Sequence, residues 1–193
     1  MTVTVAGKKI RIRNPKLWTS EDYAKLTPPD NGNFELQSGK IIFMPAPSVL
    51  HQTISMNLSL LLGGYIKQTK AGILLASPVD VVFSPHDVIQ PDLIFIKKEK
   101  AHISGARVMG APDLVIEILS PSNNPKEMSY KKHIYESSGV AEYWMVLPDE
   151  HSIVQYLTVE GEFLIKNVIG AAEELQSSTI PGFVLKVAEA FLN

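Results

Sequence analysis

The sequence has 193 residues, of which 45% are hydrophobic and 20% are charged, and these proportions are typical of a folded chain with a sizeable core. It contains no cysteine, which excludes disulfide bonds, thiolate nucleophiles and zinc sites that need sulfur. The formal net charge is −2, so the chain lacks the basic excess of proteins that bind nucleic acid tightly and without sequence preference.

No apolar run approaches the ~18 residues that would span a bilayer, and the first residues lack the pattern of a signal peptide. We therefore expect a cytoplasmic protein without a membrane contact. No internal repeat or low-complexity linker divides the sequence. Residues 1–193 are accordingly expected to form one domain, in which residues 1–17 are a loose N-terminal arm with short strand character.

The next elements are a short helix and a hairpin. The helix is expected to begin near Trp18, with Thr19 or Ser20 as its N-cap, and to end before the prolines and glycine of residues 28–32.

Residues 34–37 and 40–44 flank Ser38–Gly39. A glycine turn between two strand-like runs predicts a β-hairpin.

A long amphipathic helix is expected from about residue 48 to Lys67. Ile54, Leu58, Leu61 and Tyr65 recur there at helical spacing. His51 lies three residues before Ile54, so it is expected to point towards the core.

The rest of the chain alternates predicted strands with turns and helices. In chain order we expect strands at residues 73–83 and 92–97, a short helix within 98–110, a strand at 113–119, a helix at 126–137 with Gly139 as its C-cap, a strand at 143–147, a hairpin of residues 152–158 and 162–168, and a short C-terminal helix after Pro181–Gly182. Residues 113–119 are apolar on both faces, as in a central strand covered on each side. The predicted fold class is therefore α/β.

Two acids occupy strands in which a carboxylate is costly. Alternation places Asp92 on the face of Ile94, and Glu117 on the face of Val115. An ionised carboxylate is unfavourable there unless a cation or hydrogen-bond donors offset it. Mg²⁺ held by these oxygens and by water would do so. Alternatively, each acid is a structural residue with its own lysine or amide partner.

Lys131 is the candidate cation beside these acids. Glu127, Lys131 and Tyr135 share one helical face, so Lys131 either forms an exposed pair with Glu127 or points back towards the acids. The spacing favours neither arrangement. Taken alone, Glu35 is most simply the polar face of the hairpin, and His51 a satisfied core histidine.

Several stretches then match one family in consistent order over residues 18–190. They are Phe34–Gly39, Pro45–His51, Gln90–Asp92 and Pro112–Asn123, followed by Lys131, Tyr135, Gly139–Val140 and Glu142–Trp144. This set resembles the Uma family of restriction-endonuclease-like proteins, which in turn resembles the PD-(D/E)XK nucleases. The resemblance implies a restriction-endonuclease-like α+β fold, with a mixed central sheet flanked by helices, and a Mg²⁺- or Mn²⁺-dependent endonuclease that acts on nucleic acid, most simply DNA.

The resemblance also implies roles for individual residues. Asp92 and Glu117 are the two acids of the motif and, with the Ile118 carbonyl and Glu35, would hold the metal. The lysine that normally follows the second acid by two residues is absent, because Leu119 stands there. In the family a lysine on the following helix takes the place of the missing one, and here that lysine is Lys131. The accessory residues implied are His51, Gln90, Glu127 and Tyr135.

Two positions depart from the family pattern, and neither departure excludes activity. Glu127 and Leu147 stand where the family tends to have aspartate. A catalytically silent module that binds nucleic acid or protein is the second hypothesis, favoured by the low net charge and the displaced lysine. The third is a hydrolase that uses Asp92 and Glu117 as an acid/base pair without metal. Exposed strand edges and apolar helices make a homodimer an expectation in each case.

Overall fold

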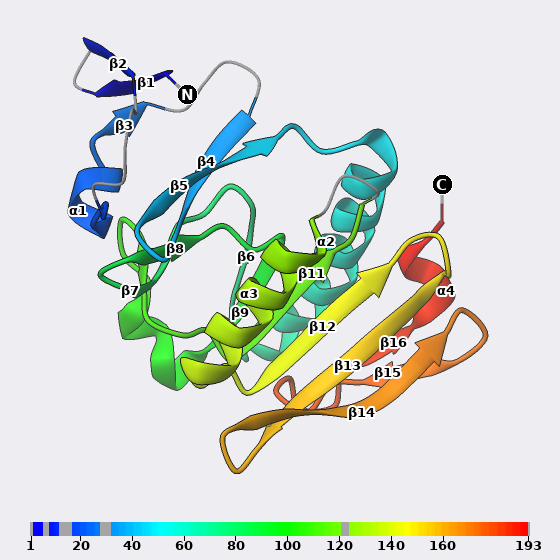
Figure 1. Cartoon of the computed structure of the whole chain (residues 1–193). Coiled ribbons are helices and arrows are strands. Elements are labelled where there is room, and N and C mark those ends of the chain that lie inside the picture. Colours follow the sequence, from blue (N-terminus) through cyan, green and yellow to red (C-terminus); the bar gives the residue numbers. More distant parts are fainter. Residues whose placement is uncertain (1, 6–7, 12–16, 28–31, 121–123, 193) are drawn as a thin grey trace.

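A six-stranded sheet forms the larger half of the molecule. The computed structural model describes residues 2–5, 8–11, 17–27, 32–120 and 124–192 (Figure 1). The strands of this sheet are β6 (Gly72–Ala76), β9 (Leu93–Lys97), β11 (Leu114–Ile118), β12 (Glu142–Leu147), β13 (Ser152–Val159) and β14 (Glu162–Gly170). Their order is β14-β13-β12-β11-β9-β6, in which β11 and β12 are parallel and the other neighbours antiparallel, so the sheet is mixed.

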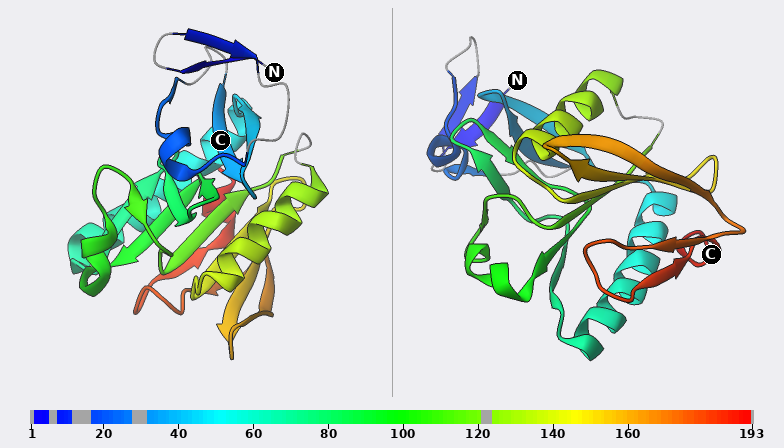
Figure 2. Two further views of the ribbon diagram at one scale, coloured as in Figure 1. Left: turned by 60° about the vertical axis from the view of Figure 1, so that its left-hand side comes forward. Right: turned by 90° about the horizontal axis from the view of Figure 1, so that it is seen from below.

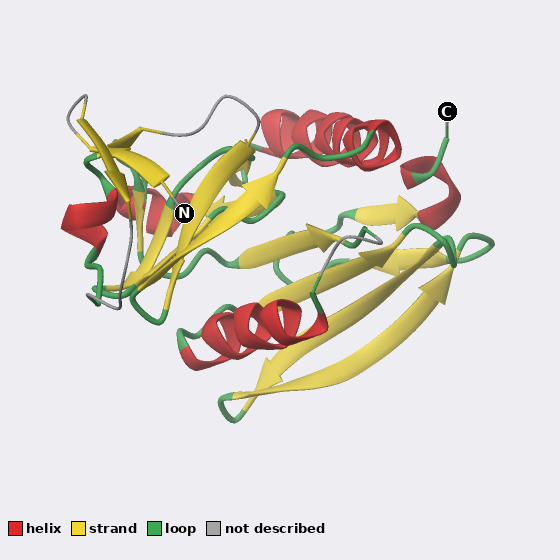
Figure 3. Cartoon of the chain, turned by 45° about the horizontal axis from the view of Figure 1, so that its top comes forward, coloured by secondary structure: helices red, strands yellow, loops and turns green. Residues whose placement is uncertain are grey.

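A five-stranded sheet lies beside it (Figure 3). It has the order β10-β7-β8-β4-β5 and is built from β4 (Gly32–Gln37), β5 (Lys40–Pro45), β7 (Val81–Ser84), β8 (Asp87–Ile89) and β10 (Val108–Met109). Two smaller sheets complete the strands: β2-β1-β3, from β1 (Thr2–Val5), β2 (Lys8–Arg11) and β3 (Leu26–Thr27), and the hairpin of β15 (Glu174–Gln176) and β16 (Val184–Lys186).

Helices cover both faces of the six-stranded sheet. On one face lie α2 (Val49–Thr69), α4 (Val187–Ala190) and the β15–β16 hairpin, and on the other lies α3 (Pro125–Ser137) (Figure 2). The α2 side is an apolar cluster in which Ile54 and Leu58 pack with Phe95, Ile116 and Trp144. β11 is buried along its whole length. The predicted central strand is therefore confirmed.

The predicted hairpin is confirmed with its turn. Gln37 pairs with Lys40, and Ser38 and Gly39 have φ of 48° and 69°, as the two central residues of a type I′ turn require. Gly139 has φ of 82° directly after the C-cap Ser138 of α3. This left-handed position is the one in which glycine most often ends a helix.

The short helix α1 (Ser20–Tyr23) begins where expected but is shorter. Thr19 is its N-cap and forms a capping box with Asp22. The helix ends after Tyr23 and β3 begins at Leu26, so residues 28–32 do not end it. Residues 28–31 lie outside the described residues.

Two predictions about the middle of the chain were wrong. Residues 73–83 are not one strand: β6 and β7 belong to different sheets, and the chain leaves β6 at Ser77–Pro78. In α2 the buried stripe continues from Leu58 to Leu62 and Ile66, while Leu61 and Tyr65 are only partly buried. The 3.6-residue period makes both stripes compatible with the sequence.

The short helix predicted within residues 98–110 is a 3₁₀ helix, Lys98–Ile103. Among the helices of the described chain, none combines the length and the apolarity needed to cross a bilayer.

A buried carboxylate fixes the C-terminal hairpin to the six-stranded sheet. Glu142 of β12 is 0% exposed. Its carboxylate accepts hydrogen bonds from Trp144 Nε1, Gln155 Nε2, Ser177 Oγ, the Ser178 and Thr179 backbone N–H groups and Thr179 Oγ1, at 2.6–2.9 Å. Such bonds to a charged acceptor are stronger than neutral ones.

We expect Glu142→Ala to lower the free energy of unfolding by about 3–5 kcal/mol, because it leaves buried donors without an acceptor. Urea unfolding followed by tryptophan fluorescence measures this. The exposed Glu162→Ala is the matched control and should change stability by less than about 0.5 kcal/mol. Equal effects of the two substitutions would contradict this role of Glu142.

Candidate active site

The residues singled out in the sequence meet at one cleft of ≈ 940 Å³. Those that line it are Glu35, His51, Gln90, Asp92, Glu117, Ile118, Glu127 and Lys131. They come from both large sheets, from α2 and from α3. Tyr135 lies fully buried beneath them, and its hydroxyl donates a hydrogen bond to Glu117 Oε1.

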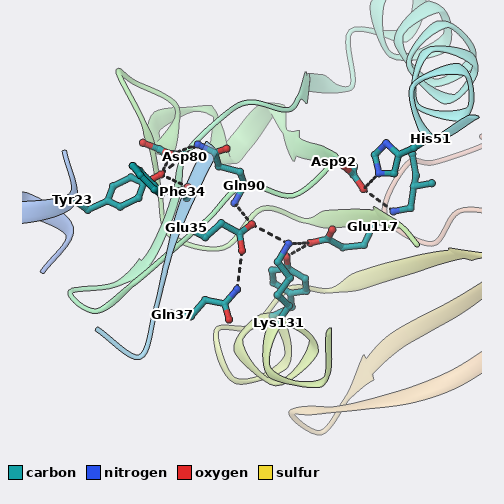
Figure 4. A network of polar contacts seen from close by, with 12 residues as sticks. Tyr23, Phe34, Glu35, Gln37, His51, Asp80, Gln90, Asp92, Glu117 and Lys131 are labelled. Carbon is teal, nitrogen blue, oxygen red and sulfur yellow. Dashed lines mark hydrogen bonds and ion pairs between the residues drawn. The ribbon is translucent and has the colours of Figure 1, made fainter. Parts of the chain in front are cut away.

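Lys131 joins the two sheets at the floor of the cleft (Figure 4). Its Nζ lies 2.9 Å from Glu35 Oε1 and 3.0 Å from Glu117 Oε1. The lysine is only 3% exposed. Of the two arrangements that the spacing allowed, the structure therefore has the one in which Lys131 points back to the acids, and not the exposed pair with Glu127.

Glu35 is buried because α3 covers the polar face of the hairpin. Phe34 and Leu36 face the opposite way, into an apolar cluster with Tyr23. Glu35 is 1% exposed, so the simple expectation of a solvated hairpin face was wrong. Gln37 Nε2 donates to its Oε2 at 2.8 Å. Both oxygens are thus engaged, since Oε1 also binds Lys131.

Asp92 and Glu117 are neighbours across two strands. Val115 pairs with Ile94, and Ile116 with Leu93. One further step in this register brings Glu117 opposite Asp92, which immediately precedes β9.

Glu117 faces α3 together with Val115, as the alternation predicted. The Asp92 carboxylate instead contacts His51 on α2, at 3.1 Å from its Nε2, and accepts the Ile118 N–H at 2.7 Å (Figure 4). The prediction that Asp92 shares a face with Ile94 was therefore wrong, because Asp92 lies outside the regular strand.

Burial and neighbouring charges shift the pKa values of the cleft residues. Burial raises the pKa of Glu117 to about 7; Lys131 opposes this rise, and the negative charges of Asp92 and Glu35 add to it. Burial would lower the pKa of Lys131, but Glu117 and Glu35 outweigh it and raise that pKa. The pKa of His51 is likewise raised, because its hydrogen bond and ion pair with Asp92 exceed the effect of burial.

The cleft has the donor chemistry for a hard divalent cation, although no ready-made shell is formed. Within the described chain, no three His, Asp or Glu side chains gather closely enough to hold a metal ion. The contacts of Asp92 and Glu117 with other described residues all involve one oxygen each, Oδ2 and Oε1. Asp92 Oδ1 and Glu117 Oε2 thus remain for a ligand, and carboxylate oxygens suit Mg²⁺ and Mn²⁺.

Sequence reasoning missed the residues that hold Gln90 and Glu35. Gln90 donates its backbone N–H to Glu35 Oε1 at 3.0 Å, and its side chain donates to Asp80 Oδ1 at 2.9 Å. The Tyr23 hydroxyl lies 2.7 Å from the Phe34 carbonyl oxygen and 3.0 Å from Asp80 Oδ1, and its single proton can be donated to either. Only Gln37 carried a signal in the sequence, because it shares a strand face with Glu35.

The fold and this cluster of acids around a lysine define a nuclease-like protein of the restriction-endonuclease class. The model of the Uma2 family, described as "Putative restriction endonuclease", matches residues 20–188, and the chain belongs to this family. No curated protein matches the chain.

A crystal structure described as "a putative nuclease belonging to DUF820", from Anabaena variabilis ATCC 29413, is similar to the chain with a TM-score of 0.75 and 20% sequence identity. The similarity covers 90% of this chain and 97% of the other. The restriction-endonuclease-like mixed α+β fold expected from the sequence is thus confirmed.

The raised pKa of Glu117 predicts a pH dependence of stability. The folded state keeps a proton that the unfolded state has released, so stability should fall as pH rises from the usual glutamate value of 4.5 through about 7. We expect the wild type to lose about 2–3 kcal/mol more over this range than Glu117→Gln. Urea unfolding in EDTA at intervals between pH 4.5 and 8 measures the difference. Parallel profiles would contradict the pKa shift.

Proposed function

We propose that this protein is a Mg²⁺- or Mn²⁺-dependent endonuclease that hydrolyses phosphodiester bonds of nucleic acid, most simply DNA. One observation supports this above the others. Three carboxylates, those of Glu35, Asp92 and Glu117, line one cleft with the buried Lys131. Family membership supports a nuclease-like activity independently.

In this proposal Asp92 and Glu117, with the Ile118 carbonyl, would hold the metal. A bound divalent cation supplies charge neutralisation at the phosphate and a more acidic water. Asp92 Oδ2 is kept in place by the Ile118 N–H and His51, so the oxygens left for the metal belong to carboxylates of fixed orientation. Pre-set ligands of this kind lower the cost of ordering the site.

Lys131 would stabilise the negative charge that develops on the phosphate. An ammonium group has three N–H donors, and Glu35 and Glu117 take two of them. The third is available to a phosphate oxygen in the cleft that Lys131 lines. Both oxygens of Glu35 already accept hydrogen bonds, so we propose that Glu35 positions Lys131 and contributes to the metal mainly through its charge. Preorganised charge of this kind usually dominates phosphoryl chemistry.

We expect Lys131→Met to lower the rate of DNA cleavage at least about 10²-fold, because it removes this charge from the transition state. Asp92→Asn and Glu117→Gln should do the same, and EDTA should abolish cleavage. Gel assays with plasmid and single-stranded DNA in Mg²⁺ or Mn²⁺ measure the rates.

The matched control for this experiment is Lys126→Met. Lys126 is an exposed lysine in the first turn of the same helix, so its loss should leave the rate within about twofold. Cleavage that persists in Asp92→Asn would sink the proposal. Cleavage that persists in EDTA would favour the acid/base pair without metal.

The silent binding module remains the second candidate, because Lys131 already occupies the gap between Glu35 and Glu117. Calorimetric titration with Mn²⁺ separates the two. The endonuclease predicts a saturable site of millimolar affinity or better, lost in Asp92→Asn and kept in the exposed control Glu162→Gln. No Mn²⁺ binding by the wild type would support the silent module.

The homodimer also remains a prediction, and α2 is the surface we propose for a second copy. Val49, Met56 and Leu60 on it are exposed, and residues 49–66 contain no acid, lysine or arginine. A two-fold axis through this stripe brings no like charges together. The edge strand β14 suits pairing less, because a bulge and Lys166 interrupt it. Sedimentation of Leu60→Lys should give monomers where the wild type gives dimers; a wild-type monomer would contradict the prediction.

A further inference from the structure

A second cavity of ≈ 410 Å³ adjoins the active-site cleft. Leu119, Leu147 and Pro148 come from the ends of β11 and β12, and Leu50 from the first turn of α2. We call this cavity the side pocket. Its volume lies within the range of small-ligand sites, about 300–1,000 Å³.

The side pocket is continuous with the cleft. Ser48, His51 and Ser120 line both. His51 is the residue whose Nε2 contacts Asp92. His51 therefore separates the side pocket from Asp92. A ligand with one group in the side pocket could place a neighbouring group beside Asp92 in the cleft.

The lining of the side pocket has a distinctive chemistry. Four of the residues that line it are apolar, and the exposed Asp149 and Glu150 line it as well. Carboxylates accept hydrogen bonds and donate none when ionised. No lysine or arginine lies among the described residues that line it. A flat apolar group with N–H donors on its rim matches this lining, and a phosphate does not.

We propose that the side pocket holds the base of the nucleotide next to the bond that is cut, and that it selects the bases with an amino group on C4 of a pyrimidine or C6 of a purine, cytosine or adenine. Cytosine and adenine present an amino donor where thymine and uracil present a carbonyl acceptor. Asp149 or Glu150 can accept a hydrogen bond from this amino group and would repel the carbonyl oxygen that replaces it. Apolar side chains on either side replace the stacking that the base has lost.

The inference rests on the proposed endonuclease and defines its substrate further. A base inside a duplex is stacked and paired, so it enters a pocket only from a single strand or after flipping out. The net charge of −2 gives little attraction to the phosphates of a duplex. Both considerations favour a single-stranded or unpaired substrate.

Binding of neutral nucleosides tests the side pocket without any cleavage. Cytidine and uridine are titrated in EDTA into the ¹⁵N-labelled full chain and followed by NMR. We expect saturable binding of cytidine, at least about fivefold tighter than that of uridine. Asp149→Asn combined with Glu150→Gln should reduce this ratio to about one, because amides also donate hydrogen bonds.

Two variants fill the side pocket. Leu147→Trp acts at the end of β12, and Leu50→Trp acts at a position that is 45% exposed, where a larger side chain is tolerated if the first variant fails to fold. Each should weaken cytidine binding at least about tenfold. Leu164→Trp, at an exposed position of β14 outside both cavities, is the matched control and should change nothing.

Cleavage of a thymine oligonucleotide with one cytosine completes the test. Cutting beside the cytosine in the wild type, with equal cutting along the strand in Leu50→Trp, supports the inference. Equal binding of the two nucleosides, or none, overturns it, as does wild-type cutting that ignores the base. Selective cytidine binding without any cleavage supports the side pocket and rejects the endonuclease instead.

Discussion

The buried ammonium of Lys131 is the constraint on which the site depends. It lies between Glu35 and Glu117, two carboxylates from different sheets, both nearly excluded from water. Without a cation between them, two acids at this depth would destabilise the fold by several kcal/mol. The two sheets can therefore pack together at this point only if Lys131, and hence α3, lies between the two buried acids. The hydrogen bond from Tyr130 Oη to Asp87 at 2.6 Å strengthens the same contact between α3 and the five-stranded sheet.

That arrangement leaves an imbalance of charge, which gives the cleft its chemistry. Asp92 adds a third carboxylate, and among the described residues its cationic contact is with His51. Burial is the main cause of the raised pKa of Glu117, and the negative charges of Asp92 and Glu35 add to it; the pKa of His51 is raised mainly by Asp92. A divalent ion would relieve the imbalance of charge, and so would a proton. The same electrostatics therefore link the stability of the fold to its proposed activity, as is common where acids are gathered for catalysis.

The sequence predicted the elements whose evidence is local. The double-sided apolar run of β11, the turn at Ser38–Gly39 and the helix α3 needed no knowledge of the partner strands. The predictions from the sequence failed where the burial of a residue depends on packing against distant parts of the chain. Glu35 alternates like a surface residue, and only α3, some 90 positions later in the chain, covers it. The donors of Glu142 include Ser177 and Thr179, 35 and 37 residues away. The convergence of Asp92, Glu117 and Lys131 was expected from the family pattern, whereas spacing alone left Lys131 undecided.

Anomalous diffraction from a crystal grown with Mn²⁺ tests the central claim most directly. The account predicts a peak bonded to Asp92 Oδ1 and Glu117 Oε2, with Lys131 still held by Glu35. An empty cleft at saturating Mn²⁺, with both carboxylates bound only to His51, Lys131 and Tyr135, would contradict it.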